Sequence, residues 1–135
     1  MELKSEVWDR VMEFASLLAQ EDQLQKFWIN YNALKDYCEA QSRDGYDHPF
    51  LWESLADFTI DDRAAIPLYT RALSRAQGDE ARAYRVSIRF ALAERHKNIG
   101  EDELARQYAI EADDEAKHID DLELRRQISK FLLSE

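Results

Sequence analysis

Apolar residues recur at helical spacing along most of the chain, and residues 65–73 give the clearest example. Small and large apolar side chains share one helix face there: Ala65, Leu68, Tyr69, Ala72 and Leu73. The small residues let a neighbouring helix approach closely, and the large ones fill the space beside it. The pattern therefore predicts a helix that packs against a partner helix.

A related pattern returns 40 residues later, in residues 104–112. Ala65 corresponds to Ala105 and Ala72 to Ala112, whereas Tyr69 corresponds to Ala109. A repeat at this interval is typical of stacked helical hairpins. The sequence thus predicts an all-α fold of stacked antiparallel hairpins, with about seven helices in a single domain over residues 1–135.

The same periodicity divides the chain into units. They are an N-terminal hairpin at 5–42, repeat units at 47–76 and 80–118, and a capping helix at 120–133. We expect Asp47 to cap the helix that begins near Pro49, and Pro67 to kink the following helix or delay its start. The N-terminal hairpin is rich in aromatic residues, namely Trp8, Phe14, Phe27, Trp28 and Tyr31. We expect them to form the core of the hairpin in preference to a ligand pocket.

The negative charge of the chain limits the kinds of partner that it can bind. The net charge is −10, and residues 1–60 hold twelve acids against five bases, a balance of −7. Such a chain lacks the basic surface that non-specific nucleic-acid binding or adsorption to anionic membranes requires. It suits a basic protein partner, although an acidic surface also serves solubility alone. With no transmembrane-length apolar run, no signal-peptide core and a single cysteine, Cys38, we expect a soluble cytoplasmic protein.

The second helix of the unit at 47–76 resembles the tetratricopeptide repeat family, in the longer-period version of kinesin light chains. That version commonly reads Ala-Glu-Pro-Leu-Tyr-Lys-Arg-Ala-Leu, and this chain matches it at Ala65, Pro67, Leu68, Tyr69, Arg71, Ala72 and Leu73. The opening Asp47-His48-Pro49 is also similar to that family. In the second unit, the residues at the family's packing positions are Leu92, Ala93, Gly100, Ala105 and Ala112.

The resemblance covers residues 47–118 and has two departures. The interval from Leu55 to Ala65 is shorter than the family's usual joint, and Ala109 stands where an aromatic residue is customary. Residues 5–42 are then a divergent repeat or a cap. The resemblance implies a right-handed superhelix whose concave face is lined by the first helix of each unit. It also implies protein–protein binding, and catalysis would be unusual.

Two charged groups are candidate contacts for a partner. Arg82, Arg85 and Arg89 form one stripe on a helix that the resemblance places on the concave face, where they could hold a partner's carboxylates. Alternatively, the arginines pair with Asp79, Glu80 or Glu94, or with the first helix of the unit at 47–76. That helix also carries Trp52, a further candidate contact for a partner. The second group is an acidic patch that could dock a basic protein, or is simply a solvated face: Glu111, Asp113, Asp114 and Glu115.

Signals for chemistry are weak. Asp114 and His118 have a spacing that can hold a divalent metal, but no third ligand converges in sequence. Cys38 lies on an apolar helix face and is expected to be a buried free thiol. There is no phosphate-binding glycine loop, Cys/His metal pattern or hydrolase elbow, so we expect no cofactor, no metal and no catalysis.

These observations favour a non-catalytic interaction module. The specific hypothesis is a small acidic inhibitor, such as an immunity protein that neutralises a toxin or effector. The alternative is an adaptor or secretion-type chaperone that holds a partner peptide in the concave groove, and a metal-dependent enzyme is a third, weaker hypothesis. A homodimer also stays open, because the aromatic hairpin and the last helix could bury apolar edges against a second copy.

Overall fold

A computed structural model describes residues 1–134, and all of its regular structure is helical. This confirms the predicted all-α class with seven α-helices in the described part of the chain. They are α1 (Ser5–Gln20), α2 (Leu24–Arg43), α3 (Pro49–Asp57), α4 (Asp62–Arg75), α5 (Arg82–Asn98), α6 (Asp102–Ala116) and α7 (Leu122–Leu133). A 3₁₀ turn at Asp79–Ala81 precedes α5. None of the helices in residues 1–134 is long and apolar enough to cross a membrane.

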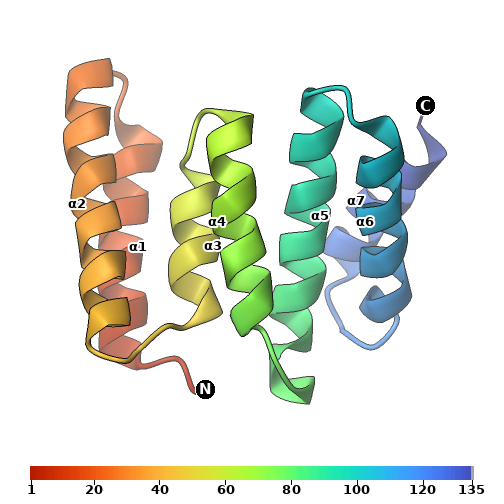
Figure 1. The fold of residues 1–135 in the computed structure, drawn as a ribbon, viewed down its shortest axis with the longest axis horizontal. Helices are drawn as coiled ribbons and strands as arrows, with labels where there is room; N and C mark the ends of the chain where they lie inside the picture. Colours follow the sequence, from red (N-terminus) through yellow and green to blue (C-terminus); the bar gives the residue numbers. More distant parts are fainter. Residues whose placement is uncertain (135) are drawn as a thin grey trace.

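The helical hairpins follow one another along the long axis of the molecule in chain order, with α2 outside α1 at the N-terminal end (Figure 1). The pair α1–α2 forms one end, and α6 and α7 form the other. Each sequential pair is in contact, so the chain is a row of hairpins, α1–α2, α3–α4 and α5–α6, closed by α7. The right-handed superhelix stays a prediction.

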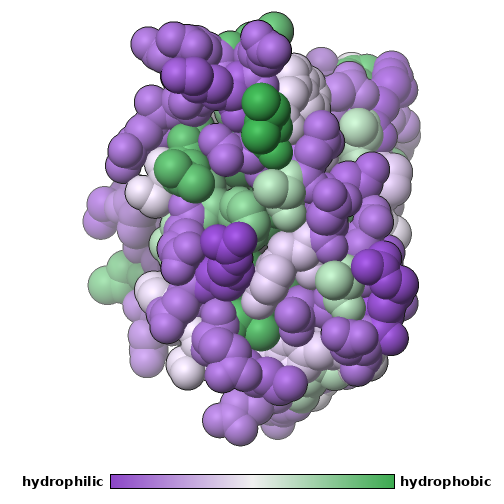
Figure 2. All heavy atoms as spheres, turned by 90° about the vertical axis from the view of Figure 1, so that its left-hand side faces the viewer, coloured by the Kyte–Doolittle hydropathy of each residue, from purple (hydrophilic) through white to green (hydrophobic). Residues whose placement is uncertain are grey.

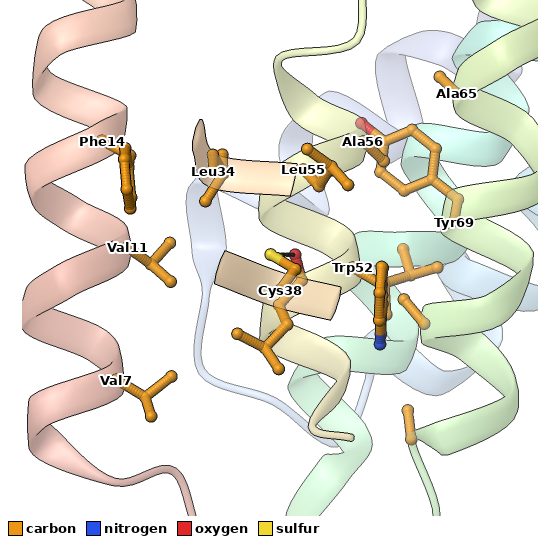
Figure 3. Packing of buried hydrophobic residues seen from close by; sticks show 14 of the residues in the cluster. Val7, Val11, Phe14, Leu34, Cys38, Trp52, Leu55, Ala56, Ala65 and Tyr69 are labelled. Carbon is orange, nitrogen blue, oxygen red and sulfur yellow. Dashed lines mark hydrogen bonds between the residues drawn. The ribbon is translucent and has the colours of Figure 1, made fainter. Parts of the chain in front are cut away.

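One main hydrophobic core runs through the first five helices. Val7, Val11 and Phe14 of α1 point toward the other core residues, which include Leu34 and Cys38 of α2 and Leu55 of α3 (Figure 3). A second cluster joins α5, α6 and α7: Val86, Phe90, Ala112, Ala116 and Ile128. The capping helix is therefore attached through its own small core.

The face predicted on α4 packs as expected. Ala65, Tyr69 and Ala72 are buried in the main core, with Leu68 and Leu73 partly buried against it. The corresponding residues of the second unit are also buried: Leu92, Ala93, Ala105 and Ala112.

Gly100 was wrongly expected to act through packing. It is exposed, and a Cβ added there would meet no atom within 4 Å. Its φ of +82° lies in the left-handed region that glycine adopts without strain. Gly100 is thus required by the turn between α5 and α6 and not by helix contact.

One local prediction was also wrong, and one of the two alternatives for Pro67 is excluded. Asp47 does not cap α3, because His48 is the N-cap and its Nδ1 accepts the Phe50 N–H at 3.0 Å. The Asp47 carboxylate instead accepts hydrogen bonds from Trp52 and Arg75. The start of α4 is not delayed by Pro67, since Asp61 caps the helix by accepting the Ala64 N–H at 3.1 Å.

Candidate interaction site

The two charged groups predicted separately from sequence face each other across α5 and α6. Arg85 binds Glu115 through Nη2 at 2.6 Å and through Nε at 3.0 and 3.1 Å. Arg89 donates from Nη1 to the other carboxylate oxygen at 2.9 Å, and Arg82 lies 3.5 Å from Glu115. One carboxylate is therefore shared by three arginines that lie on one helix face.

Arg85 also ties this cluster to the end of α4. Its Nη1 donates to the carbonyl of Ala76 at 3.0 Å and to that of Gly78 at 2.6 Å. These carbonyls follow the helix C-terminus, where backbone acceptors lack helical partners. The hydrogen bond from Arg85 holds the pKa of Glu115 below its usual range, and the bond to Glu115 raises the pKa of Arg85. The pair therefore stays ionised.

This geometry decides between the two interpretations of the arginine stripe. The arginines pair within the chain, but mainly with Glu115 of the following helix and not with the acids named in advance. Only Asp79 contacts the stripe as expected, 3.4 Å from Arg82. The groove at the cluster holds about 430 Å³ and has as many acids as arginines on its walls, with Glu111 and Asp114 beside Glu115. It is not a basic clamp for carboxylates.

The acidic patch is divided by the same contacts. Glu111 and Glu115 turn toward the arginines, with Glu111 4.0 Å from Arg89. Asp114 stays 81% exposed and contacts only Lys117 among its ion partners, at 3.4 Å. Asp113 is half-buried beside it. Asp113 and Asp114 are the part of the patch that a partner can reach.

Trp52 is not a surface contact. It is 2% exposed, its indole N–H donates to Asp47, and the Arg71 guanidinium lies 3.6 Å from its ring centroid. Trp52 fills the core between α3 and α4, so its placement on a partner-binding face was wrong. Periodicity on α3 could not resolve this, since most of that short helix is buried.

Three further arginines of the middle helices are also held by their own chain. Arg75 pairs with Asp47, and Arg71 donates to Ser42 at 3.0 Å. Arg95 binds Asp62 at 3.2 Å and reaches the carbonyl of Ala56 at 3.2 Å. These arginines pair within the fold, and acids outnumber bases among the charged side chains of the chain as a whole, 28 to 18.

A group of carboxylates that sequence reasoning missed lies on α3 and α5. Ser87 of α5 donates to Glu53 of α3, and Tyr69 donates to Asp57, each at 2.5 Å. Burial raises the pKa of Glu53 to about 7, and it also raises the pKa of Asp57. The sequence did contain a sign of this group, because Glu53 and Asp57 are two acids one turn apart on a mostly apolar helix.

The N-terminal hairpin exposes part of its aromatic content. Phe14 and Tyr31 are buried, as a hairpin core requires. Trp8 and Trp28 are 46% and 41% exposed, so the prediction of an aromatic core holds for only part of the set. Large exposed aromatic side chains are the commonest anchors of protein interfaces.

Groups with potential chemistry are sparse. In residues 1–134 no three His, Cys, Asp or Glu side chains converge in a metal-binding arrangement. Cys38 is buried, its thiol donates to the Leu51 carbonyl, and burial raises its pKa to about 12. A thiol in that environment is not a nucleophile at neutral pH.

Comparison with known proteins adds no assignment. No family model matches the chain, and neither a curated protein nor a solved structure matches it. The all-α fold therefore rests on the structure itself. The likeness to tetratricopeptide repeats rests on the residues that resemble that family.

Proposed function

We propose that this chain is a non-catalytic protein-binding module, and specifically a small acidic inhibitor or immunity protein that neutralises a basic toxin or effector. One observation carries the proposal: most arginines of α4 and α5 pair within their own chain, whereas acids such as Asp114 face outward. Arg75, Arg85 and Arg95 each hold a carboxylate of their own chain. Each pair removes one base and one acid, so the remaining side chains still carry the full net charge of −10.

An acidic exterior attracts a basic partner over distances of about the Debye length and speeds its encounter. Specific binding also needs apolar anchors, and the exposed rings of Trp8 and Trp28 can supply them. Inhibitors of this kind act by covering a complementary surface, which requires no catalytic group.

The test uses proteins encoded beside this chain in its own genome. Each is co-produced with the full chain, and complex formation is measured by size-exclusion chromatography together with growth of the host. We expect one basic neighbour to arrest growth when produced alone and to form a salt-sensitive complex with this chain. If no basic neighbour binds, or if the bound one remains toxic, the inhibitor proposal is rejected.

A pair of charge variants sharpens that experiment. Asp114→Lys reverses a charge that is 81% exposed, and Lys117→Glu reverses the opposite charge one turn away. For a basic partner that docks on this edge, the first variant slows association and the second leaves it unchanged or faster. Equal effects of both variants would show that the α6–α7 edge is not the docking surface.

The adaptor function is the second candidate, and the carboxylates of α3 and α5 favour it. Glu53 and Asp57 share one side of α3, and Glu94 of α5 lies close enough to Asp57 to affect its own pKa. Such a row could bind Lys or Arg side chains of an extended peptide. A short peptide from the partner that binds as tightly as the whole protein would support this function over the inhibitor.

A further inference from the structure

The outer end of the helical row is an uncovered apolar face. Helices α1 and α2 contact each other and α3, so their outer side closes the row. Figure 2 shows this side, where several hydrophobic side chains lie in the upper half and centre among hydrophilic ones. Leu17 of α1 is 52% exposed and Ile29 of α2 is 63% exposed. Repeat arrays normally end in a polar surface, because an apolar end invites association.

The positions of the buried residues of α2 determine which of its side chains lie on this outer face. Tyr31, Leu34 and Cys38 are buried toward the row. Ile29 is exposed, and it is followed one turn later by Ala33, which is half-buried and packs in part against the core. Ala33 lies at the midpoint of the helix Leu24–Arg43. A small residue at the centre lets another helix cross closely, with a large apolar side chain on each side of the crossing.

We propose that the protein forms a two-fold symmetric dimer in which α2 packs antiparallel against α2 of a second copy, centred on Ala33. A two-fold axis at Ala33 places Ile29 of each copy opposite Tyr37 of the other. Tyr37 is half-buried and its ring packs against Phe14 with centroids 6.1 Å apart, which gives Ile29 a fixed apolar surface to meet. The interface is self-complementary, as a two-fold dimer requires.

Charge favours a second copy over a basic partner at this face. The charged residues that the register places there are Glu6, Arg10, Glu13, Lys26 and Asp36. Their balance is −1, whereas residues 1–60 carry −7. Arg10 and Glu13 also pair with each other at 2.9 Å. The face is thus the least acidic part of an acidic half, so two copies can approach there without strong repulsion.

The available area is sufficient. Helices of 16 and 20 residues are about 24 and 30 Å long. At a width of about 10 Å, α2 alone presents about 300 Å² per copy, and the outer side of α1 beside it raises the upper limit to about 550 Å² per copy, or about 1,100 Å² in the dimer. Specific interfaces begin at about 1,000 Å² of total buried area. The dimer is therefore expected to be of moderate affinity.

Analytical ultracentrifugation of the full chain tests the proposal. We expect a dimer at about 100 μM that dissociates on dilution. Ile29→Lys should weaken the dimer at least tenfold, whereas Ile60→Lys should not, although Ile60 is 60% exposed and equally apolar. Circular dichroism checks that both variants are folded. A wild-type chain that is monomeric at that concentration, or an equal effect of the two substitutions, would overturn the proposal.

Cross-linking tests the register separately. In the proposed dimer the two copies of residue 33 meet at the axis, while the two copies of residue 29 are about 12 Å apart along the helices. A disulfide needs Cα atoms within about 7 Å. Ala33→Cys should therefore cross-link readily under mild oxidation and Ile29→Cys should not, with Cys38 silent because it is fully buried. Faster cross-linking at position 29 than at position 33 would overturn the centring on Ala33.

Discussion

Glu53 should make the stability of this protein fall as the pH rises from about 4.5 to about 7, between its unfolded and its folded pKa. Its carboxylate lies between α3 and α5 and accepts the Ser87 hydroxyl, and burial raises its pKa to about 7 from the ordinary value of 4.5. The folded chain therefore binds a proton more tightly than the unfolded chain does. Below the unfolded pKa the side chain is protonated in both states and costs nothing. Above the folded pKa the charged form must be buried, and stability is lost.

The size of the effect follows from the shift. A difference of about 2.5 pKa units corresponds to about 3 kcal/mol at about 1.4 kcal/mol per unit. Integrated over the window, the cost is below about 1 kcal/mol at about pH 5 and reaches about 3 kcal/mol at about pH 8. Glu53→Gln removes the charge and keeps an oxygen that accepts the Ser87 hydroxyl. The variant should thus be more stable than the wild type, and the gain should grow with pH.

The assay is urea unfolding followed by tryptophan fluorescence at several values between about pH 5 and pH 8. Glu103→Gln, on the exposed side of α6, is the matched control and should follow the wild-type curve. A stability difference between Glu53→Gln and wild type that does not change with pH would refute the reasoning. So would a loss of stability in the variant at about pH 8.

Three further predictions address other parts of the fold. Glu115→Ala leaves three arginines without their shared carboxylate and should lower the free energy of unfolding in urea by about 2–3 kcal/mol. Asp114→Ala, the control, should lower it by less than about 0.5 kcal/mol, and equal losses would contradict the network. Gly100→Ala should cost about 1 kcal/mol through its φ of +82°, and an unchanged thermal midpoint would show that the turn relaxes. Cys38 should react with a thiol reagent only as fast as the chain opens, so rapid labelling of native protein would contradict its burial.

Local periodicity was sufficient to predict the helices and the packing face of α4. Ala65, Tyr69 and Ala72 repeat at a spacing that only a helix places on one side, and all three are buried. The stop at Gly100 could be anticipated for a similar reason, since left-handed turns select glycine. These features depend on residues within one or two turns of each other.

The candidate site depends on contacts that periodicity does not encode. The pairing of Arg85 with Glu115 joins residues of two helices, and the register between those helices is set by their packed small residues. The sequence identified the arginines and the acids as two charged groups, but it could not predict that they contact each other. Trp52 was misplaced because α3 is short and buried on most of its surface, so its pattern does not identify a free side.

The inhibitor proposal and the dimer proposal make different use of charge, so salt separates them. A basic partner drawn to the acidic exterior gains much of its association rate from long-range attraction, which is strongly screened above about 0.15 M salt. The α2 interface is apolar with a charge balance of −1 on each copy, so added salt should leave the dimer unchanged or strengthen it. For a partner that docks through Asp114 of α6, the two surfaces do not overlap, because Ile29 lies on α2 at the opposite end of the helical row. A partner anchored on Trp8 and Trp28 would instead share the α1–α2 hairpin with the dimer face. A partner bound at one end and a second copy at the other would then form a complex of two chains and two partners.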